Sequence, residues 1–198
     1  MISYTRELWQ PRERTTSSLV VSVVLIVAFA CLTAVAARVA IYLGFTPVPI
    51  TLQTLAVLLS GALLGSRAGA SSQLVYIVGG VAGLPIGAGG NSGIPWLIGP
   101  TFGYAIGFVA AAFVVGLMVE RGWGEGIWRL AVAMIFGNVV IYVLGVARLG
   151  AFLDGGAQAA FVAGVAPFLI GDALKIAVAA CVVPSARALI AGLRDRST

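Results

Sequence analysis

Two charged residues lie within an otherwise apolar stretch near the end of the chain. Asp172 and Lys175 belong to VAPFLIGDALKIAVAACVV, residues 165–183, which is apolar enough to cross a bilayer. Side chains three positions apart project from one face of an α-helix, so both are expected to face the same neighbours. A charge at mid-membrane costs roughly 2.5–3.5 kcal/mol and persists where it is paired or functional. This segment is therefore the candidate functional core, with an ion pair that merely joins helices as the alternative.

The composition defines the class of protein. Of the 198 residues, 60% are hydrophobic and 10% are charged, whereas a soluble domain carries about 25% charged residues. The sequence therefore predicts an integral membrane protein in contact with lipid. Its pI of about 9.8 would suggest nucleic acid in a soluble protein, but here the arginines lie at segment ends, so no nucleic-acid partner is expected.

The residue types needed for most catalysis are scarce. The chain has no histidine, and its only lysine lies within an apolar segment. It carries no G-x-x-x-x-G-K-[ST], G-x-S-x-G, H-E-x-x-H or C-x-x-C motif. Cys31 and Cys181 both fall inside apolar segments, which suits neither a disulfide nor a metal site. We therefore expect no enzyme, metal or cofactor, which leaves binding or transport.

Six apolar segments predict an all-α membrane protein with six transmembrane helices. They cover residues 19–42, 50–64, 69–84, 102–119, 130–146 and 165–183. Nearly all flanking arginines fall on one side of the predicted membrane, namely Arg6, Arg12, Arg14, Arg67, Arg121, Arg129, Arg187, Arg194 and Arg196. Because positive residues concentrate in the cytoplasm, both termini are expected to be cytoplasmic.

The chain is expected to form one membrane domain with two short flanks. Residues 1–18 are predicted as a cytoplasmic leader, 19–185 as a six-helix substrate-binding membrane domain, and 186–198 as a basic cytoplasmic tail. The second and third segments are near or below spanning length, so they are expected to border a cavity. The uncharged, glycine-rich stretch 85–101 is predicted to fold over the outer mouth as a lid, or else to be a surface loop anchored by Trp96.

Small and polar residues within the segments predict helix contacts. Ala30 and Ala34 are four apart and form a shallow strip that serves either an internal neighbour or a partner subunit. Arg38 is placed near the end of the first segment, at the headgroups or facing a polar cavity. Asn138 is expected to form an interhelical hydrogen bond.

Several short motifs follow one another along the chain, namely TPVPITLQTLAVL at 46–58, GALLG at 61–65, GLP at 83–85, GPT and GY between 99 and 104, and GDALK at 171–175. Together they resemble the motifs of the BioY family, the biotin-binding S components of energy-coupling factor (ECF) transporters. The resemblance implies the S-component fold and high-affinity capture of biotin on the outer side of a bacterial cytoplasmic membrane. It also implies a transmembrane T subunit and two cytoplasmic ATPase subunits that use the ATP, with Ala30 and Ala34 docking on the T subunit.

This resemblance suggests roles for particular side chains. Biotin has a ureido ring with two N–H donors and a carbonyl, an apolar thiophane ring and a carboxylate. Asp172 can accept from the ureido N–H groups, and Lys175 can meet the carboxylate or the carbonyl. Asn91 can both donate and accept.

The remaining suggested roles concern the walls of the pocket and the carboxylate. Trp96 and Tyr104 could wall the bicyclic ring, while Arg38 or Gln53 could bind the carboxylate. Two alternatives remain open: an S component for another vitamin, and a membrane scaffold that transports nothing.

Overall fold

The structure is a computed structural model that describes residues 16–195, with side chains described from 19 to 187. Most of the predicted leader, with Arg6, Arg12 and Arg14, lies outside the described residues, as does the end of the predicted tail. The longer helices are α2 (Thr16–Ala36), α3 (Gln53–Leu64), α4 (Ser66–Val81), α6 (Phe102–Met118), α7 (Ile127–Leu149) and α9 (Leu169–Asp195).

Shorter elements connect these helices. The short helices are α5 (Gly93–Ile98), α8 (Gly156–Gly164), the 3-10 turns η1 (Ala88–Gly90) and η3 (Ala166–Phe168), and the π-helical turn η2 (Val119–Trp123). The strands β1 (Ala40–Ile41) and β2 (Ile50–Thr51) pair in antiparallel fashion, with Ala40 opposite Thr51. The all-α prediction therefore holds for the bundle but missed this ribbon.

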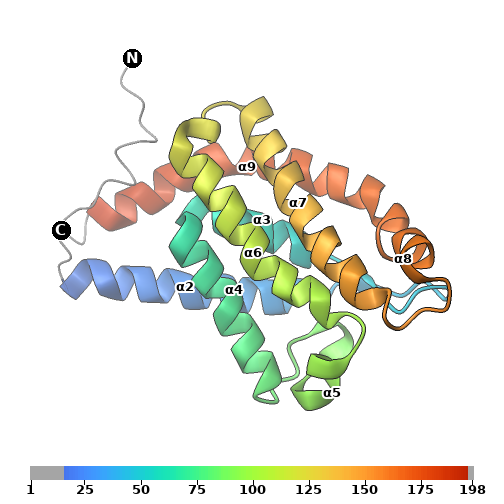
Figure 1. Cartoon of the computed structure of the whole chain (residues 1–198). Coiled ribbons are helices and arrows are strands. Elements are labelled where there is room, and N and C mark those ends of the chain that lie inside the picture. Colours follow the sequence, from blue (N-terminus) through green and yellow to red (C-terminus); the bar gives the residue numbers. More distant parts are fainter. Residues whose placement is uncertain (1–15, 196–198) are drawn as a thin grey trace.

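Helix α6 occupies the middle of the bundle (Figure 1). It packs against α3, α4 and α7, while α2 packs on α3 and α4, and α9 packs on α3 and α7. Glycines allow these backbones to approach closely. A Cβ at Gly107 of α6 would lie 2.9 Å from the Ile141 Cα of α7, and one at Gly61 of α3 would collide with the Ala112 carbonyl of α6. Small residues at helix contacts are typical of membrane bundles.

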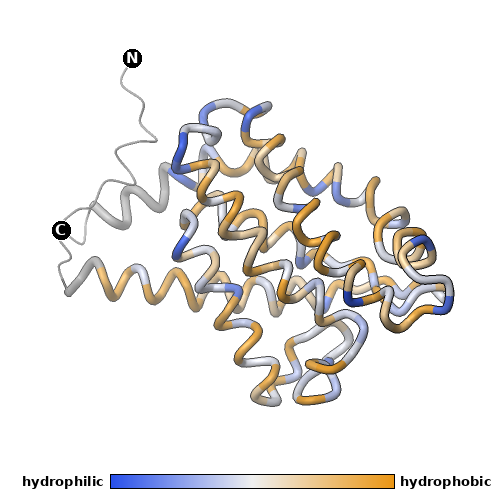
Figure 2. The backbone as a smooth tube through the Cα atoms, viewed as in Figure 1, coloured by the Kyte–Doolittle hydropathy of each residue, from blue (hydrophilic) through white to orange (hydrophobic). Residues whose placement is uncertain are grey.

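Four stretches of the described chain are long and apolar enough to cross a membrane, at Leu19–Ala36, Phe102–Trp123, Ile127–Leu149 and Gly156–Arg187. Most turns within the helices are hydrophobic, and the most hydrophilic stretches lie mainly at the connections (Figure 2). Large apolar side chains remain exposed along α2, including Val20, Val23 and Val24. Such a surface suits hydrocarbon rather than water, and the chain is a multi-pass membrane protein.

Helices α3 and α4 are short, as their sequences predicted. They contain 12 and 16 residues, which correspond to about 18 and 24 Å, whereas the hydrocarbon core is about 30 Å thick. The predicted connection over 65–69 reduces to Gly65, whose φ of 85° favours glycine. Helix α4 therefore begins at Ser66 rather than at residue 69.

Several predicted helix ends were wrong. The first helix ends at Ala36 rather than at Tyr42, because the next residues turn and enter β1. This ribbon follows from the loop with Pro47 and Pro49, which favours extended backbone. Helix α7 is longer than 130–146, and α9 continues past residue 183 through Pro184 to Asp195, so most of the predicted tail is helical.

Candidate functional site

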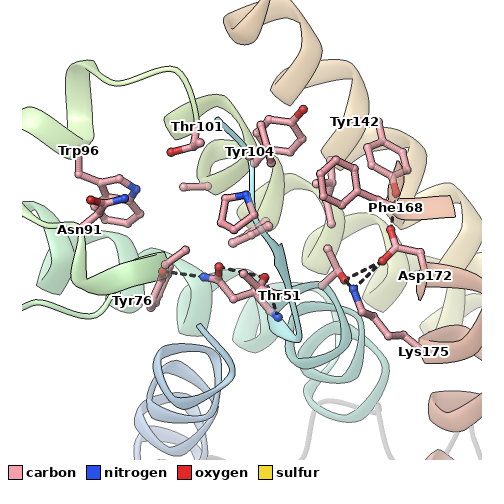
Figure 3. A pocket seen from close by; sticks show the side chains of 18 residues that line it. Thr51, Tyr76, Asn91, Trp96, Thr101, Tyr104, Tyr142, Phe168, Asp172 and Lys175 are labelled. Atoms are coloured by element: carbon pink, nitrogen blue, oxygen red, sulfur yellow. Dashed lines mark hydrogen bonds and ion pairs between the residues drawn. The ribbon is translucent and has the colours of Figure 1, made fainter. Parts of the chain in front are cut away.

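A cavity lies between the helices and the segment 85–101 (Figure 3). It is lined by Val48, Pro49, Thr51, Gln53, Thr54, Tyr76, Ala88, Asn91, Trp96, Thr101, Tyr104, Ala105, Phe108, Ile141, Tyr142, Phe168, Asp172 and Lys175. These residues come from the elements β2, α3, α4, η1, α5, α6, α7, η3 and α9, from the loop between β1 and β2, and from the connections on either side of α5. The cavity thus collects side chains that are far apart in the sequence.

Asp172 and Lys175 form the centre of a polar group at one end of the cavity. They project from the same face of α9, as predicted, and Lys175 Nζ lies 2.8 Å from Asp172 Oδ1. Thr54 Oγ1 donates to the same carboxylate oxygen at 3.1 Å and accepts from Lys175 Nζ at 2.9 Å. The hydroxyl of Tyr142 on α7 donates to Asp172 Oδ2. Both carboxylate oxygens are therefore held in place.

The charged side chains of this network are buried, so each of them needs a partner. Asp172 is only 3% exposed and Lys175 only 9% exposed. An unpaired charge at such depth would be expensive, but the ion pair and the two hydroxyls compensate the carboxylate. The group is electrically balanced before any ligand arrives, and each charge fixes the orientation of the other.

A second polar group lies at a different part of the cavity, beneath the segment 85–101. Gln53 Nε2 donates to the Tyr76 hydroxyl at 2.7 Å, and this hydroxyl donates to the Ile86 carbonyl at 3.3 Å. Thr51 Oγ1 donates to Gln53 Oε1 at 3.2 Å. Asn91 lines the cavity nearby (Figure 3). This group contains amides and hydroxyls but no charged side chain.

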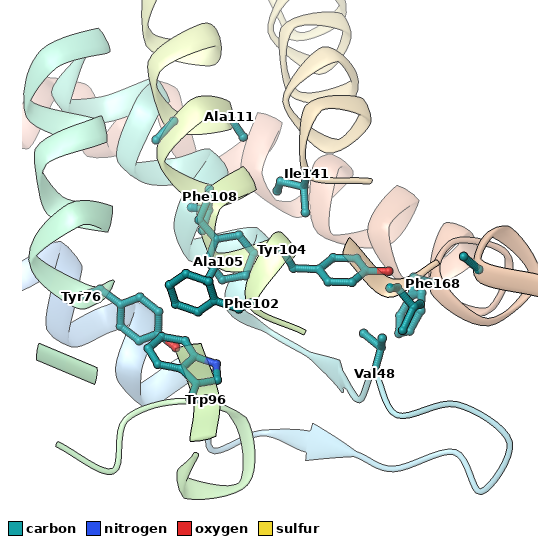
Figure 4. Close-up of a cluster of buried hydrophobic side chains, with 14 of the residues drawn as sticks. Val48, Tyr76, Trp96, Phe102, Tyr104, Ala105, Phe108, Ala111, Ile141 and Phe168 are labelled. Carbon is teal, nitrogen blue, oxygen red and sulfur yellow. The ribbon is translucent and has the colours of Figure 1, made fainter. Parts of the chain in front are cut away.

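Aromatic rings line the cavity beside the two polar groups. Tyr104 and Phe168 lie above both groups in the view of Figure 3, and the Tyr104 hydroxyl donates to the Gly164 carbonyl at 2.9 Å. Trp96 is 7% exposed and packs edge-on against Tyr76 and Phe102, with ring centroids 5.8 and 5.4 Å apart (Figure 4). The cavity therefore has an aromatic side and two polar groups.

The packing of Trp96 decides between the two interpretations of segment 85–101. A Cβ at Gly80 of α4 would collide with the indole ring, so this glycine allows the ring to pack directly against the helix. Trp96 is thus a core residue and not an anchor in the membrane interface. The segment folds back over the cavity as a lid, and its short helix α5 carries the ring inward.

Two arginines hold the ends of this lid. Arg38 Nη2 donates to the Pro85 carbonyl at 2.6 Å. Arg148 Nη2 donates to the Ile98 carbonyl at 2.6 Å, and its Nε donates to the Gly99 carbonyl at 3.3 Å. Arg38 is exposed and does not line the cavity, so the suggestion that it binds a ligand carboxylate is not supported by its position. The first helix ends before Arg38, which directs this side chain to the lid.

The structure places the alanine strip of α2 against the rest of the chain. Ala30 is 6% exposed and belongs to the main hydrophobic cluster, and Ala34 is half-buried against the same cluster. In this arrangement the strip packs against other helices of the same chain, which was one of the two interpretations. Docking of a partner through the two alanines stays a prediction.

Several residues of the site were missed in the sequence. Thr54 directly follows Gln53 in the motif at 46–58, and Tyr142 lies one helical turn after Asn138, but nothing local shows that both reach Asp172. Tyr76 lies in a predicted helix without any distinguishing neighbour. Asn138 was expected to donate an interhelical hydrogen bond through its NH2 group, and this stays a prediction; its acceptor Oδ1 is buried without a partner in the described structure.

Comparisons with known proteins agree with this architecture. Residues 10–192 match the family model described as the BioY family. A protein of Pyrococcus horikoshii named probable biotin transporter BioY is 39% identical over 155 residues, which cover 78% of this chain and 89% of that protein. The biotin transporter BioY of Thermotoga maritima is 39% identical over 154 residues, which cover 78% and 88% of the two chains.

A solved structure has the same fold. A crystal structure at 2.1 Å of the S-component for biotin from an ECF-type ABC transporter superposes with a TM-score of 0.80 at 23% sequence identity. The match covers 88% of this chain and 94% of the other. With the family model and the relatives in agreement over most of the sequence, the chain belongs to the BioY family.

Proposed function

We propose that this chain captures biotin with high affinity and takes part in its uptake as the S component of an ECF-type ABC transporter. The observation that carries the proposal is the lidded cavity with an aromatic side and two separate polar groups. Biotin offers matching groups, namely a ureido ring, an apolar thiophane ring and a carboxylate. The relatives are named as biotin transporters, which supports transport rather than catalysis.

We place the ureido ring at the end with Asp172. The carboxylate of biotin would add a second negative charge beside Asp172. The positive charge of Lys175 already balances the charge of Asp172, so this second charge would be repelled. A ureido ring is neutral, and its N–H groups and carbonyl can add to the bonds of the carboxylate, the ammonium and the Thr54 hydroxyl. Lys175 then serves the same end of the ligand as Asp172.

The biotin carboxylate is assigned to the end beneath the lid. The lining there offers the amides of Gln53 and Asn91 and the hydroxyl of Thr51, and no acidic side chain. Gln53 Nε2 uses one N–H for Tyr76 and keeps its second N–H for a ligand. Trp96 and Tyr104 would then enclose the rings and chain between the two ends.

The transport cycle requires partners. We expect a transmembrane T subunit and two cytoplasmic ATPase subunits, which use the ATP, with this chain in a bacterial cytoplasmic membrane and both termini cytoplasmic. Six membrane crossings would follow if α3 and α4 act as short crossings. Docking on the T subunit is expected on α2, where Ala34 is more accessible than Ala30.

The direct test is biotin binding by the purified chain, measured by calorimetry or native mass spectrometry. Saturable binding that other vitamins do not displace is the expected result. No binding by correctly folded protein would contradict the proposal, and displacement by another vitamin would reassign the ligand. If the chain were only a scaffold, apolar replacements of both Asp172 and Lys175 would keep folding and all activity.

The placement of the carboxylate has its own test. Gln53→Leu should weaken binding of biotin more than binding of biotinamide, because the uncharged amide of biotinamide accepts a weaker hydrogen bond. A hydrogen bond to a charged group contributes about 1.5–3 kcal/mol and a neutral one about 0.5–1.5 kcal/mol, so the losses for the two ligands should differ by about fivefold or more. An equal loss for both ligands would place the carboxylate elsewhere.

A further inference from the structure

The ligand cavity shares a wall with a second space on the side of the protein. A groove runs along α7 and α9 and is lined mostly by apolar side chains, among them Ile135, Val139 and Ala177. Of the described residues, Tyr142 and Asp172 line both the groove and the cavity. The hydrogen bond between these two side chains therefore lies at the boundary between the two spaces.

The groove faces the bilayer. Both of its long helices belong to stretches that are long and apolar enough to span a membrane. The side chains of Ile135, Val139 and Val143 on α7 are about half exposed. Hydrocarbon is the natural neighbour of this surface. The buried ion pair of Asp172 and Lys175 is thus close to the hydrocarbon of the bilayer, which offers no hydrogen bonds.

The bonds of Asp172 divide between the two sides. Its Oδ1 is held by Lys175 and Thr54, which line the cavity but not the groove. Its Oδ2 is held by Tyr142, which reaches across from α7. Among the hydrogen bonds of the described side chains, this is the one that ties the carboxylate to the helix on the far side of the groove.

We propose that Tyr142 is a positioning residue that closes the side wall of the ligand cavity against the lipid. Its hydroxyl turns Asp172 Oδ2 away from the hydrocarbon and holds α7 and α9 together at the depth of the ion pair. Without this donor, the carboxylate would border the groove with an unpaired oxygen. The role does not depend on which vitamin binds, so it goes beyond the proposed function.

The test compares two carbodiimides on the complete, ligand-free chain in lipid nanodiscs. Dicyclohexylcarbodiimide dissolves in the bilayer, whereas a water-soluble carbodiimide enters from the outer mouth. Either reagent adds a carboxylate oxygen and a proton to give an O-acylisourea. This product rearranges to an N-acylurea adduct, or the Lys175 amine displaces the urea and forms an internal amide with net loss of water. Mass spectrometry of the peptide with Asp172 detects both products.

In the wild type, we expect slow reaction of Asp172 with the lipid-soluble reagent. Tyr142→Phe keeps the ring but removes the donor. A hydrogen bond to a charged group contributes at least about 1.5 kcal/mol, so the reaction of Asp172 should become about tenfold faster or more. The water-soluble reagent should react at nearly the wild-type rate in the same variant. Equal rates of the lipid-soluble reagent in both proteins would overturn the proposal.

Two controls separate a closed wall from general loosening. Thr54→Val removes a donor to the same carboxylate from the cavity side, and Tyr104→Phe removes a tyrosine hydroxyl that lines the cavity but not the groove. Both should leave the lipid-phase reaction of Asp172 close to wild type. A comparable acceleration in either control, or with the water-soluble reagent, would also overturn the proposal. Thermal unfolding of each variant confirms that it is folded, and because no vitamin is used, the outcome is independent of the proposed function.

Discussion

Charged side chains pack inside the bundle in two regions of the molecule, buried at the cavity and half-buried at the opposite end of α6, and they bind to different kinds of group. At the cavity, Asp172 and Lys175 bond to each other and to side-chain hydroxyls. At the opposite end of α6, Glu120 accepts from the Ser66 amide at 2.7 Å and from its hydroxyl at 2.9 Å. Arg187 donates there to the carbonyls of Ala62 and Gly124 at 2.9–3.3 Å.

The difference lies in what surrounds the charges. Glu120 and Arg187 form hydrogen bonds with backbone groups that helix ends leave unpaired. Glu120 thereby caps the start of α4, and Arg187 caps the end of α3. The backbones there are in close contact, since a Cβ at Gly116 would collide with Gly65 and Ser66. The ion pair of α9 instead lines the cavity. A charge inside this bundle therefore indicates a ligand site only where it borders such a cavity.

The largest effect is expected for the ion pair. Asp172→Asn and Lys175→Ala should each lower biotin affinity by a few kcal/mol, because a buried polar partner is left unpaired. This loss corresponds to more than about a hundredfold in the dissociation constant. Calorimetry on the purified variants measures it, and wild-type affinity in both would assign the pair a purely structural role.

The opposite region should show the reverse pattern. Glu120→Ala removes the acceptor of the Ser66 amide and hydroxyl, so the free energy of unfolding should fall by about 1–3 kcal/mol. Biotin affinity of the folded protein should not change, because Glu120 does not line the cavity. Thermal unfolding and calorimetry on the same sample test both statements. A large loss of affinity with unchanged stability would remove the contrast between the two regions.

A smaller effect is expected at the lid. Arg148→Ala removes the bonds to the Ile98 and Gly99 carbonyls and the contact with the Phe152 ring, 5.2 Å from the guanidinium. The lid should open more often, and biotin should dissociate about tenfold faster, as expected from a charged hydrogen bond contributing about 1.5 kcal/mol. Stopped-flow release of a labelled biotin measures the rate. An unchanged rate would mean that other contacts hold the lid.

The smallest effect is expected for Arg38→Ala. This exposed side chain makes a hydrogen bond to the Pro85 carbonyl, and such a bond contributes about 1 kcal/mol. Biotin affinity should fall by no more than about fivefold. Calorimetry with biotin and biotinamide provides the check, since a loss of more than tenfold for biotin alone would identify Arg38 as the carboxylate ligand after all.

The sequence predicted those parts of the structure that depend on local patterns. Apolar segments indicated the long helices, and the spacing of Asp172 and Lys175 predicted one shared face of α9. The uncharged, glycine-rich segment 85–101 predicted the lid. The residue types also identified Gln53 and Asn91, which the structure brings to the same cavity.

Other parts depend on contacts between distant residues. The ribbon of β1 and β2 required a pairing across the loop 42–49, which ended the first helix early and moved Arg38 out of the cavity. Tyr142 and Thr54 became recognisable only when α3, α7 and α9 were placed together. Hydroxyl residues within apolar helices are too common to indicate a site without such placement.

The shortness of α3 bears on the distance between the cavity and the opposite end of the bundle. Gln53 and Thr54 stand at its first turn and line the cavity, while its last turn lies at the end of the bundle that Glu120 and Arg187 stabilise. Only 12 residues separate these two ends, or about 18 Å of helical rise. The cavity and the opposite end of the bundle are therefore only one short helix apart.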